Sequence, residues 1–165
     1  MNDLIFKKIE KKDVPFVNEV RNIYAKEFLH DSREFTLSET YDWFENYNPN
    51  YWIIFLSDDR IGYFRLSNYS PVNKNIYIGA DISPKFRGKG YGKLSYQKFL
   101  PFIFNNFLLH KISLEVLSTN TIAISLYKKL GFVQEGVKRD EVFKNYKWVD
   151  SIIMSILKRE YNEKN

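Results

Sequence analysis

Apolar and polar residues alternate along the chain in two patterns, which together predict about seven strands and four helices. Short apolar runs, several of them bounded by turn residues, predict strands, and apolar residues three and four positions apart predict helices. The resulting order, β-α-α-β-β-β-α-β-α-β-β, is typical of one mixed sheet with helices packed on it, in the α/β (α+β) class. The expected strands lie near 4–9, 51–56, 61–67, 76–82, 111–117, 132–138 and 147–157, and the expected helices near 13–28, from 36 to about 47, from 88 to beyond 99, and 120–131.

Polar and conformationally special residues mark where several of these helices begin or end. Asp13 and the segment 36–39, Thr-Leu-Ser-Glu, have the form of N-terminal caps, and Asn120 has the same role for the last helix. Gly131 stands where a left-handed residue commonly ends a helix. Pro101 lacks an amide donor and clashes one turn back, so we expect the third helix to kink or break there.

Length and composition limit the classes of protein to which the chain can belong. Its 165 residues fit one domain, which we take to be 1–165, and 44% hydrophobic with 27% charged residues is typical of a globular protein. The absence of cysteine excludes disulfides, thiolate metal sites and cysteine nucleophiles, and only two histidines are present, so no metal is expected. Neither a signal-peptide stretch nor an apolar segment long enough to cross a bilayer is found, which predicts a cytoplasmic protein with no membrane partner.

A glycine-rich turn between an expected strand and an expected helix is the most informative segment of the chain. Gly88, Gly90 and Gly92 follow the strand ending at Ile82, and six Lys or Arg without any Asp or Glu lie between residues 82 and 114. Glycine lets a backbone approach a ligand closely, and free amides at a helix start attract anions, so this turn predicts a phosphate site. The spacing GxGxG matches neither a Walker A loop nor a dinucleotide fingerprint. A solvated basic helix face after a glycine turn is the alternative.

The same turn resembles part of a known family. Arg87, Gly90 and Gly92 fit the pattern [Arg/Gln]-x-x-Gly-x-[Gly/Ala], which is similar to the acetyl-CoA pyrophosphate loop of the GNAT N-acetyltransferase superfamily. A second block, 114–132, resembles that family's LEV…N..A..LY.K.LGF segment. Weaker similarity outside these blocks points to the branch that acetylates amino sugars, ribosomal proteins and polyamines.

The resemblance implies a fold, a co-substrate and a division of the chain. The fold would be a single N-acetyltransferase domain with a mixed, mostly antiparallel sheet whose strands splay apart at the acetyl-CoA site. Helices on the acceptor side would occupy 13–47, the acetyl-CoA core 76–132 and a C-terminal hairpin 132–158. The residues implied to bind acetyl-CoA are Asp81, Ile82, Arg87, Gly88, Lys89, Gly90, Gly92, Lys93 and Asn120.

Acetyl transfer to an amine needs an acid for the departing sulfur and a base for the ammonium. The resemblance gives the acid role to Tyr127, whose alternative is a core tyrosine on an amphipathic helix. Many family members carry a base glutamate where this chain has Tyr77. Glu115 is the expected replacement, because it lies 12 residues before Tyr127, like the glutamate of ribosomal-protein alanine acetyltransferases. A structural ion pair at Glu115, with proton removal through a water chain, is the alternative.

The acceptor is less determined by the sequence than the co-substrate. Similarity favours a nucleotide-linked amino sugar bound by Arg21, Asn22, Glu39 and Tyr77, whereas a net charge of −4 over residues 26–45 suits a polyamine or a protein N-terminal amine. A non-catalytic acyl-CoA sensor is the alternative of another class. The basic residues gather in one loop instead of a broad face, which argues against nucleic acid. The branch also makes a homodimer possible.

Overall fold

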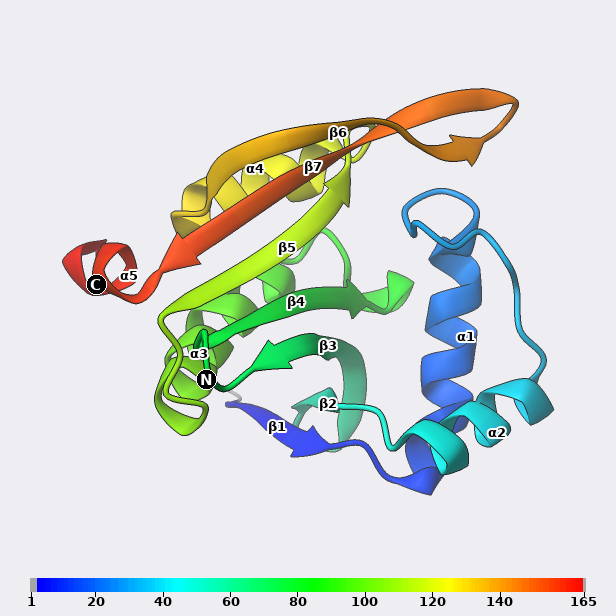
Figure 1. Cartoon of the computed structure of the whole chain (residues 1–165). Coiled ribbons are helices and arrows are strands. Elements are labelled where there is room, and N and C mark those ends of the chain that lie inside the picture. Colours follow the sequence, from blue (N-terminus) through cyan, green and yellow to red (C-terminus); the bar gives the residue numbers. More distant parts are fainter. Residues whose placement is uncertain (1–2, 165) are drawn as a thin grey trace.

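A seven-stranded sheet runs through the computed structural model, which describes residues 3–164 (Figure 1). The strand order across the sheet is β1-β2-β3-β4-β5-β7-β6. The strands are β1 (Leu4–Lys8), β2 (Tyr51–Leu56), β3 (Asp59–Ser70), β4 (Asn75–Ile82), β5 (Lys111–Leu117), β6 (Val133–Lys144) and β7 (Lys147–Leu157). The helices are α1 (Val14–Ala25), α2 (Leu37–Tyr47), α3 (Tyr91–Asn106), α4 (Thr121–Leu130) and α5 (Lys158–Lys164), with 3-10 turns at Lys11–Asp13 and Pro84–Phe86.

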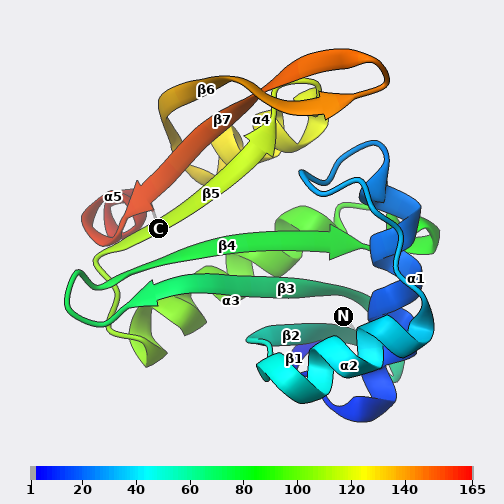
Figure 2. The same ribbon diagram turned by 45° about the vertical axis from the view of Figure 1, so that its right-hand side comes forward.

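The sheet splays open at its centre, as expected. Every neighbouring pair of strands is antiparallel except β4 and β5, which run parallel. That parallel pairing covers only Asn75–Tyr77 against Lys111–Ser113. Beyond it, β4 continues to Ile82 and β5 to Leu117 without pairing, and the two strands diverge (Figure 2). The backbone polar groups along this gap are free to meet a ligand.

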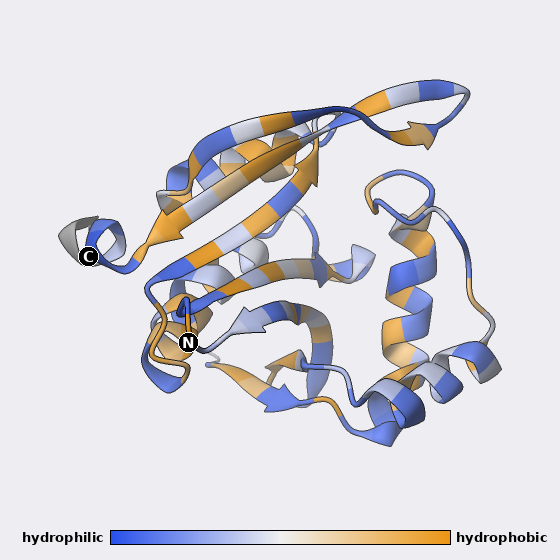
Figure 3. Cartoon of the chain, viewed as in Figure 1, coloured by the Kyte–Doolittle hydropathy of each residue, from blue (hydrophilic) through white to orange (hydrophobic). Residues whose placement is uncertain are grey.

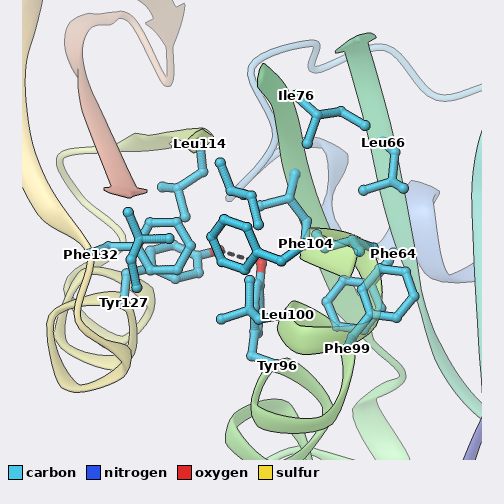
Figure 4. Packing of buried hydrophobic residues seen from close by; sticks show 14 of the residues in the cluster. Phe64, Leu66, Ile76, Tyr96, Phe99, Leu100, Phe104, Leu114, Tyr127 and Phe132 are labelled. Atoms are coloured by element: carbon cyan, nitrogen blue, oxygen red, sulfur yellow. Dashed lines mark hydrogen bonds between the residues drawn. The ribbon is translucent and has the colours of Figure 1, made fainter. Parts of the chain in front are cut away.

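Each face of the sheet packs against its own set of helices. On one face, Phe64 of β3 stacks on Phe99 of α3 with ring centroids 4.2 Å apart, and both are fully buried (Figure 4). Burial of such a ring stabilises the fold by roughly 1.5–3 kcal/mol. On the opposite face, Val17 and Val20 of α1 pack with Tyr63 of β3. Figure 2 shows α1 and α2 in front of the sheet and α3 behind it.

Strand alternation decides which side chains reach which face. Successive residues of a strand point to opposite sides, so β5 contributes Leu114 and Val116 to the core beneath α3 and α4. Glu115 points to the side covered by α1 and the loop after it. The same alternation puts Ile78 of β4 in the core and Asp81 on the α1 side. Figure 3 shows the alternating hydropathy along β5.

Local signals are confirmed at three helix ends. The Thr36 hydroxyl accepts a hydrogen bond from the Glu39 amide, and the Glu39 carboxylate accepts one from the Thr36 amide, which completes a capping box. Asn120 Oδ1 accepts from the Ala123 amide at 3.2 Å, and Gly131 adopts a left-handed φ of 98°. Asp13 is the exception among the predicted caps, because its carboxylate makes no capping hydrogen bond to α1 and accepts instead from the Glu10 amide and from Arg60.

The structure departs from the sequence-based expectation at four other places, and tertiary contacts explain the first two. α3 continues through Pro101 to Asn106 without a break, because buried residues on both sides of Pro101 fix the helix against the sheet. α1 ends at Ala25 instead of near residue 28, where Lys144 Nζ donates to the carbonyls of Ala25 and Lys26. β6 runs on to Lys144, and the polar helix α5 has too few apolar residues to show periodicity.

Candidate active site

A cavity of about 730 Å³ opens on the α3 and α4 side of the splay. Its walls are the end of β4, the turn that follows it, and the first turns of α3 and α4. Eight of the nine residues predicted to bind acetyl-CoA line it: Asp81, Ile82, Arg87, Gly88, Gly90, Gly92, Lys93 and Asn120. The ninth, Lys89, lies over the Phe86 ring and is not part of the lining.

The turn that borders this cavity is shaped by its glycines. Gly88 and Gly90 have φ of +72° and +83°, in the left-handed region that side chains other than glycine rarely adopt. No atom lies within 4 Å of where their Cβ atoms would be, so this stretch of backbone is open to a ligand. α3 begins directly afterwards at Tyr91, and the free amides of its first turn favour an anion.

Two polar groups beside the turn are also suited to a phosphorylated ligand. Arg87 lies over the rings of Tyr24 and Phe28, 5.1 and 5.2 Å from their centroids, which holds its guanidinium at the cavity wall. Ser95 is 1% exposed and lines the same cavity, and its hydroxyl has no hydrogen-bond partner within residues 3–164. The cavity therefore fits a large anionic ligand with further hydrogen-bonding groups, such as coenzyme A.

Tyr127 of α4 lies where this cavity meets a second one. Its hydroxyl is 3.4 Å from the hydroxyl of Tyr96, and its ring is almost fully buried in the core (Figure 4). Burial raises the pKa of Tyr127, so the hydroxyl carries its proton at neutral pH. Tyr127 is thus both a core residue and a buried proton donor that reaches a ligand cavity.

The second cavity, of about 280 Å³, lies on the α1 side of the sheet. It shares Asp81, Asn120 and Tyr127 with the first cavity, so the two are joined through the gap between β4 and β5. Its remaining walls come from α1, the segment 28–31, β3 and β5. Charged side chains from those elements line it: Arg21, Asp31, Arg65 and Glu115, with His30 beside them.

Glu115 takes part in a network that extends to the C-terminal hairpin. Its Oε1 pairs with Lys138 Nζ at 2.8 Å, and its Oε2 lies 4.0 Å from His30 Nε2. His30 Nε2 is also 2.7 Å from the Ser151 hydroxyl. Burial lowers the pKa of His30, which keeps the imidazole neutral at neutral pH. The expected ion pair at Glu115 is present, and the carboxylate still borders the second cavity.

Comparison with known proteins agrees with this geometry. Residues 17–132 match the model of the acetyltransferase (GNAT) family. The chain belongs to this family. It is an N-acetyltransferase that uses acetyl-CoA as its co-substrate, and the larger cavity has the position and chemistry for that molecule.

Individual acetyltransferases are similar over most or part of the chain. A spermidine N(1)-acetyltransferase of Vibrio cholerae is 29% identical over 97% of this chain and 96% of its own length. A putative ribosomal N-acetyltransferase of Bacillus subtilis is 29% identical over 61% of this chain and 55% of its own. The crystal structure of the Vibrio cholerae spermidine N-acetyltransferase with CoA and spermine has a TM-score of 0.89 at 24% identity, covering 96% and 98% of the two chains.

Three of the residues expected to bind the acceptor line neither cavity of this acetyltransferase. Asn22 holds the loop before α2 by donating to the Phe35 carbonyl and accepting from the Phe35 amide. Glu39 forms the capping box of α2. Tyr77 sits within β4, opposite Ser113 of β5, where the strands are still paired. Of the four, only Arg21 lines the second cavity, so acceptor binding by the other three stays a prediction.

The acetyltransferase site also contains groups that sequence reasoning missed. Arg65 of β3 and the carboxylate of Asp81 form an ion pair of 3.4 Å at the second cavity, and Tyr96 reaches the Tyr127 hydroxyl. A charged residue on each of two neighbouring apolar strands is the signal that could have identified the first pair. No group of three or more His, Asp or Glu side chains within the described residues could hold a metal ion, and no helix there is long and apolar enough to cross a membrane.

Proposed function

We propose that this acetyltransferase acetylates a primary amine of a polyamine of the spermidine type, by direct attack in a ternary complex. The observation that carries the proposal is the meeting of two cavities at Tyr127, one suited to coenzyme A and one lined by three carboxylates and two guanidinium groups. Asp31, Asp81 and Glu115 would attract a flexible polycation. The similarity to a spermidine N(1)-acetyltransferase over nearly the whole chain supports the same acceptor class.

The reaction forms a bond between the amine nitrogen and the acetyl carbon and breaks the bond from that carbon to sulfur. The nitrogen loses a proton, and the sulfur leaves as a thiolate that needs one. We assign that second proton to the Tyr127 hydroxyl, because the side chain reaches both cavities and its raised pKa keeps it protonated. Glu115 is the base proposed from the sequence, and its position on the second cavity supports a role on the acceptor side.

The oxyanion formed during attack needs a hydrogen-bond donor in the gap between β4 and β5. The Ser83 amide donates to Ile61 of β3, so the amide of the preceding residue, Ile82, points the other way, toward the gap. The Ile82 carbonyl on that side accepts from the Tyr24 hydroxyl at 2.7 Å, which fixes the strand end. We therefore propose the Ile82 amide as the donor that stabilises the oxyanion.

A nucleotide-linked amino sugar is the second candidate acceptor. Arg21 and Arg65 line the acceptor cavity, and guanidinium groups are suited to binding a diphosphate. Both guanidinium groups are paired with carboxylates of the same cavity, Arg21 with Asp31 at 3.6 Å and Arg65 with Asp81 at 3.4 Å, so charge alone does not decide between the two acceptors. The polyamine takes precedence because a spermidine N(1)-acetyltransferase is similar over nearly the whole chain. A cytoplasmic location and a homodimer stay predictions from the sequence.

Release of free thiol from acetyl-CoA tests the proposal when the enzyme is given spermidine, a nucleotide-linked amino sugar and a peptide with a free N-terminus in separate assays. We expect the highest kcat/KM with spermidine. Turnover restricted to the amino sugar or the peptide would reject the polyamine assignment. Tight CoA binding with no turnover on any of the three would favour the acyl-CoA sensor.

A further inference from the structure

One oxygen of the Asp81 carboxylate, Oδ2, lacks a hydrogen-bond partner among residues 3–164, at the point where the two cavities meet. The residue is 8% exposed and lines both cavities. The nearest opposite charge is Arg65 Nη2, 3.4 Å from Oδ2. A buried carboxylate oxygen without a donor is costly, and a ligand that donates to it removes that cost. The site is therefore ready to accept a cationic donor.

The direction of the side chain places this oxygen on the acceptor side. Asp81 is opposite Tyr63 in the register of β3 and β4, on the face that α1 covers. The adjacent residue, Ile82, packs into the core on the other face. Two successive residues thus provide a carboxylate for the acceptor side and a backbone amide for the gap between the strands.

Arg65 and Gly79 form a support for this carboxylate. Gly79 is opposite Arg65 in the strand register, and a Cβ at position 79 would lie 2.9 Å from Arg65 Nη2. Any side chain there would displace the guanidinium. The Arg65 Nε is also buried without a hydrogen-bond partner in the described part of the chain. Arg65 therefore lies across Gly79 with Asp81 as its main partner, which fixes where the carboxylate stands.

Glu115 differs from Asp81 in its hydrogen-bond partners and in the cavities that it lines. Its Oε1 already accepts a hydrogen bond from Lys138 at 2.8 Å, so its charge is locally balanced by an ammonium group. Glu115 lines only the second cavity, whereas Asp81 lines both that cavity and the one suited to coenzyme A. Of the two carboxylates, Asp81 lies closer to where both substrates must meet and has the greater need of a donor.

We propose that the Asp81 carboxylate binds the reacting amine of the acceptor and orients it toward the gap between β4 and β5. Arg65 is the positioning residue that holds this carboxylate, and Glu115 contributes negative charge farther along the acceptor cavity. The assignment rests on the proposed function, because it requires an amine acceptor. The assignment concerns only the amine that reacts, and it does not depend on the rest of the acceptor molecule.

The test compares Asp81→Asn with Glu115→Gln in the purified full-length protein, using spermidine and acetyl-CoA. We expect Asp81→Asn to lower kcat/KM for spermidine about 10- to 100-fold, since a hydrogen bond to a charged group is lost, while the Kd for CoA is unchanged. Glu115→Gln removes the proposed base, so we expect it to lower kcat with little change in KM for spermidine, whereas Asp81→Asn mainly raises that KM. Asp81→Asn with wild-type kcat/KM for spermidine, or with an equal loss of CoA affinity, would overturn the assignment.

Two further variants keep the test decisive if Asp81→Asn does not fold. Asp81→Glu keeps the charge opposite Arg65 but moves it by one methylene. We again expect a lower kcat/KM for spermidine with an unchanged Kd for CoA. Arg65→Lys keeps a cation and should recover part of the kcat/KM that Arg65→Met loses. Asp81→Glu or Arg65→Met with unimpaired turnover would reject the two roles respectively. A wild-type protein that turns over no amine would instead reject the proposed function, and this assignment with it.

Discussion

The two cavities that meet at Tyr127 differ in how much backbone and how many charged side chains line them. One wall of the cavity on the α3 side is a continuous stretch of chain between residues 81 and 93, with left-handed glycines and a helix start, and side chains from α1, α3 and α4 complete it. The one on the α1 side is formed by charged side chains from α1, the segment 28–31, β3, β4 and β5. A backbone site of this kind fixes one invariant ligand group, whereas a site built from side chains can change its ligand by substitution. The sequence therefore predicts the co-substrate, whereas it does not determine the acceptor.

The largest expected effect belongs to Tyr127, one of the residues that the two cavities share. Tyr127→Phe removes the proposed acid and leaves the ring packing in place, so we expect kcat to fall by about 10²- to 10⁴-fold. The KM values for spermidine and acetyl-CoA should change little, because neither cavity loses its binding groups. Steady-state kinetics measures both. A kcat equal to that of the wild type would show that the thiolate takes its proton from elsewhere.

Loss of Lys144 should weaken mainly the acceptor region. Its Nζ is buried with the side chain and donates to the carbonyls of Ala25 and Lys26 and to the Ser32 hydroxyl, which secures the loop carrying His30. Lys144→Met leaves these acceptors unsatisfied, and we expect it to lower the free energy of unfolding by about 1–3 kcal/mol. Chemical denaturation checks this value.

The same variant distinguishes the two regions in binding. We expect KM for spermidine to rise in Lys144→Met more than the Kd for CoA does, because this loop contributes Phe28, Leu29, His30 and Asp31 to the second cavity but only Phe28 to the first. An exposed lysine of α4 that lines neither cavity, changed in Lys128→Met, is the matched control for the loss of one charge. Equal weakening of both ligands would show that the two cavities are not independent.

A substitution in the glycine turn should weaken the binding of CoA and leave the recognition of spermidine intact. Gly90→Val forces a β-branched residue into a left-handed conformation, at a cost of roughly 1–2 kcal/mol. We expect CoA affinity to fall about tenfold in calorimetry, with spermidine recognition preserved at saturating acetyl-CoA. Gly90→Asn is the control, since asparagine tolerates this conformation better. If Gly90→Val binds CoA as the wild type does, the turn does not contact the co-substrate.

The smallest expected effect is a pH dependence from His30. Burial lowers the pKa of this imidazole below its usual 6.5, so the native state binds its proton less readily than the unfolded chain does. The stability that this provides is present above about pH 6.5 and is lost as the pH falls through the lower folded pKa. Glu115, Arg65, Glu141 and Lys138 are the charged groups that act on it.

His30→Gln removes that titration and keeps a polar partner for Ser151. We expect the difference in free energy of unfolding between variant and wild type to shrink as the pH is lowered from 7 to 5. Thermal or denaturant unfolding at several pH values measures it. A constant difference over this range would contradict the role given to burial of His30.

How far the sequence predicts this molecule depends on how local each feature is. The strand and helix order, the caps at Thr36 and Asn120 and the glycine turn follow from neighbouring residues, and all are found in the structure. α3 passes through Pro101 without a break because packing from distant residues outweighs one missing hydrogen bond. Local patterns carry no information on that balance.

The acceptor cavity shows the same limit more clearly. Arg65 and Asp81 are 16 positions apart and become partners only through the register of β3 and β4. Lys144 reaches the end of α1 across 119 positions. Asn22 and Glu39 have the polarity expected of binding residues, yet their hydrogen bonds are spent on the loop before α2. The sequence therefore indicates that such a polar residue has a role, but it does not distinguish ligand binding from a structural hydrogen bond.

The central claim is that one acetyl group passes from acetyl-CoA to a polyamine amine through the gap between β4 and β5. Mass spectrometry of spermidine after incubation with the enzyme and acetyl-CoA, together with quantitation of free thiol, tests this directly. We predict monoacetylated spermidine in amounts equal to the thiol released, and neither product with Tyr127→Phe beyond a small residual rate. Unmodified spermidine alongside stoichiometric acetylation of a nucleotide-linked amino sugar would contradict it.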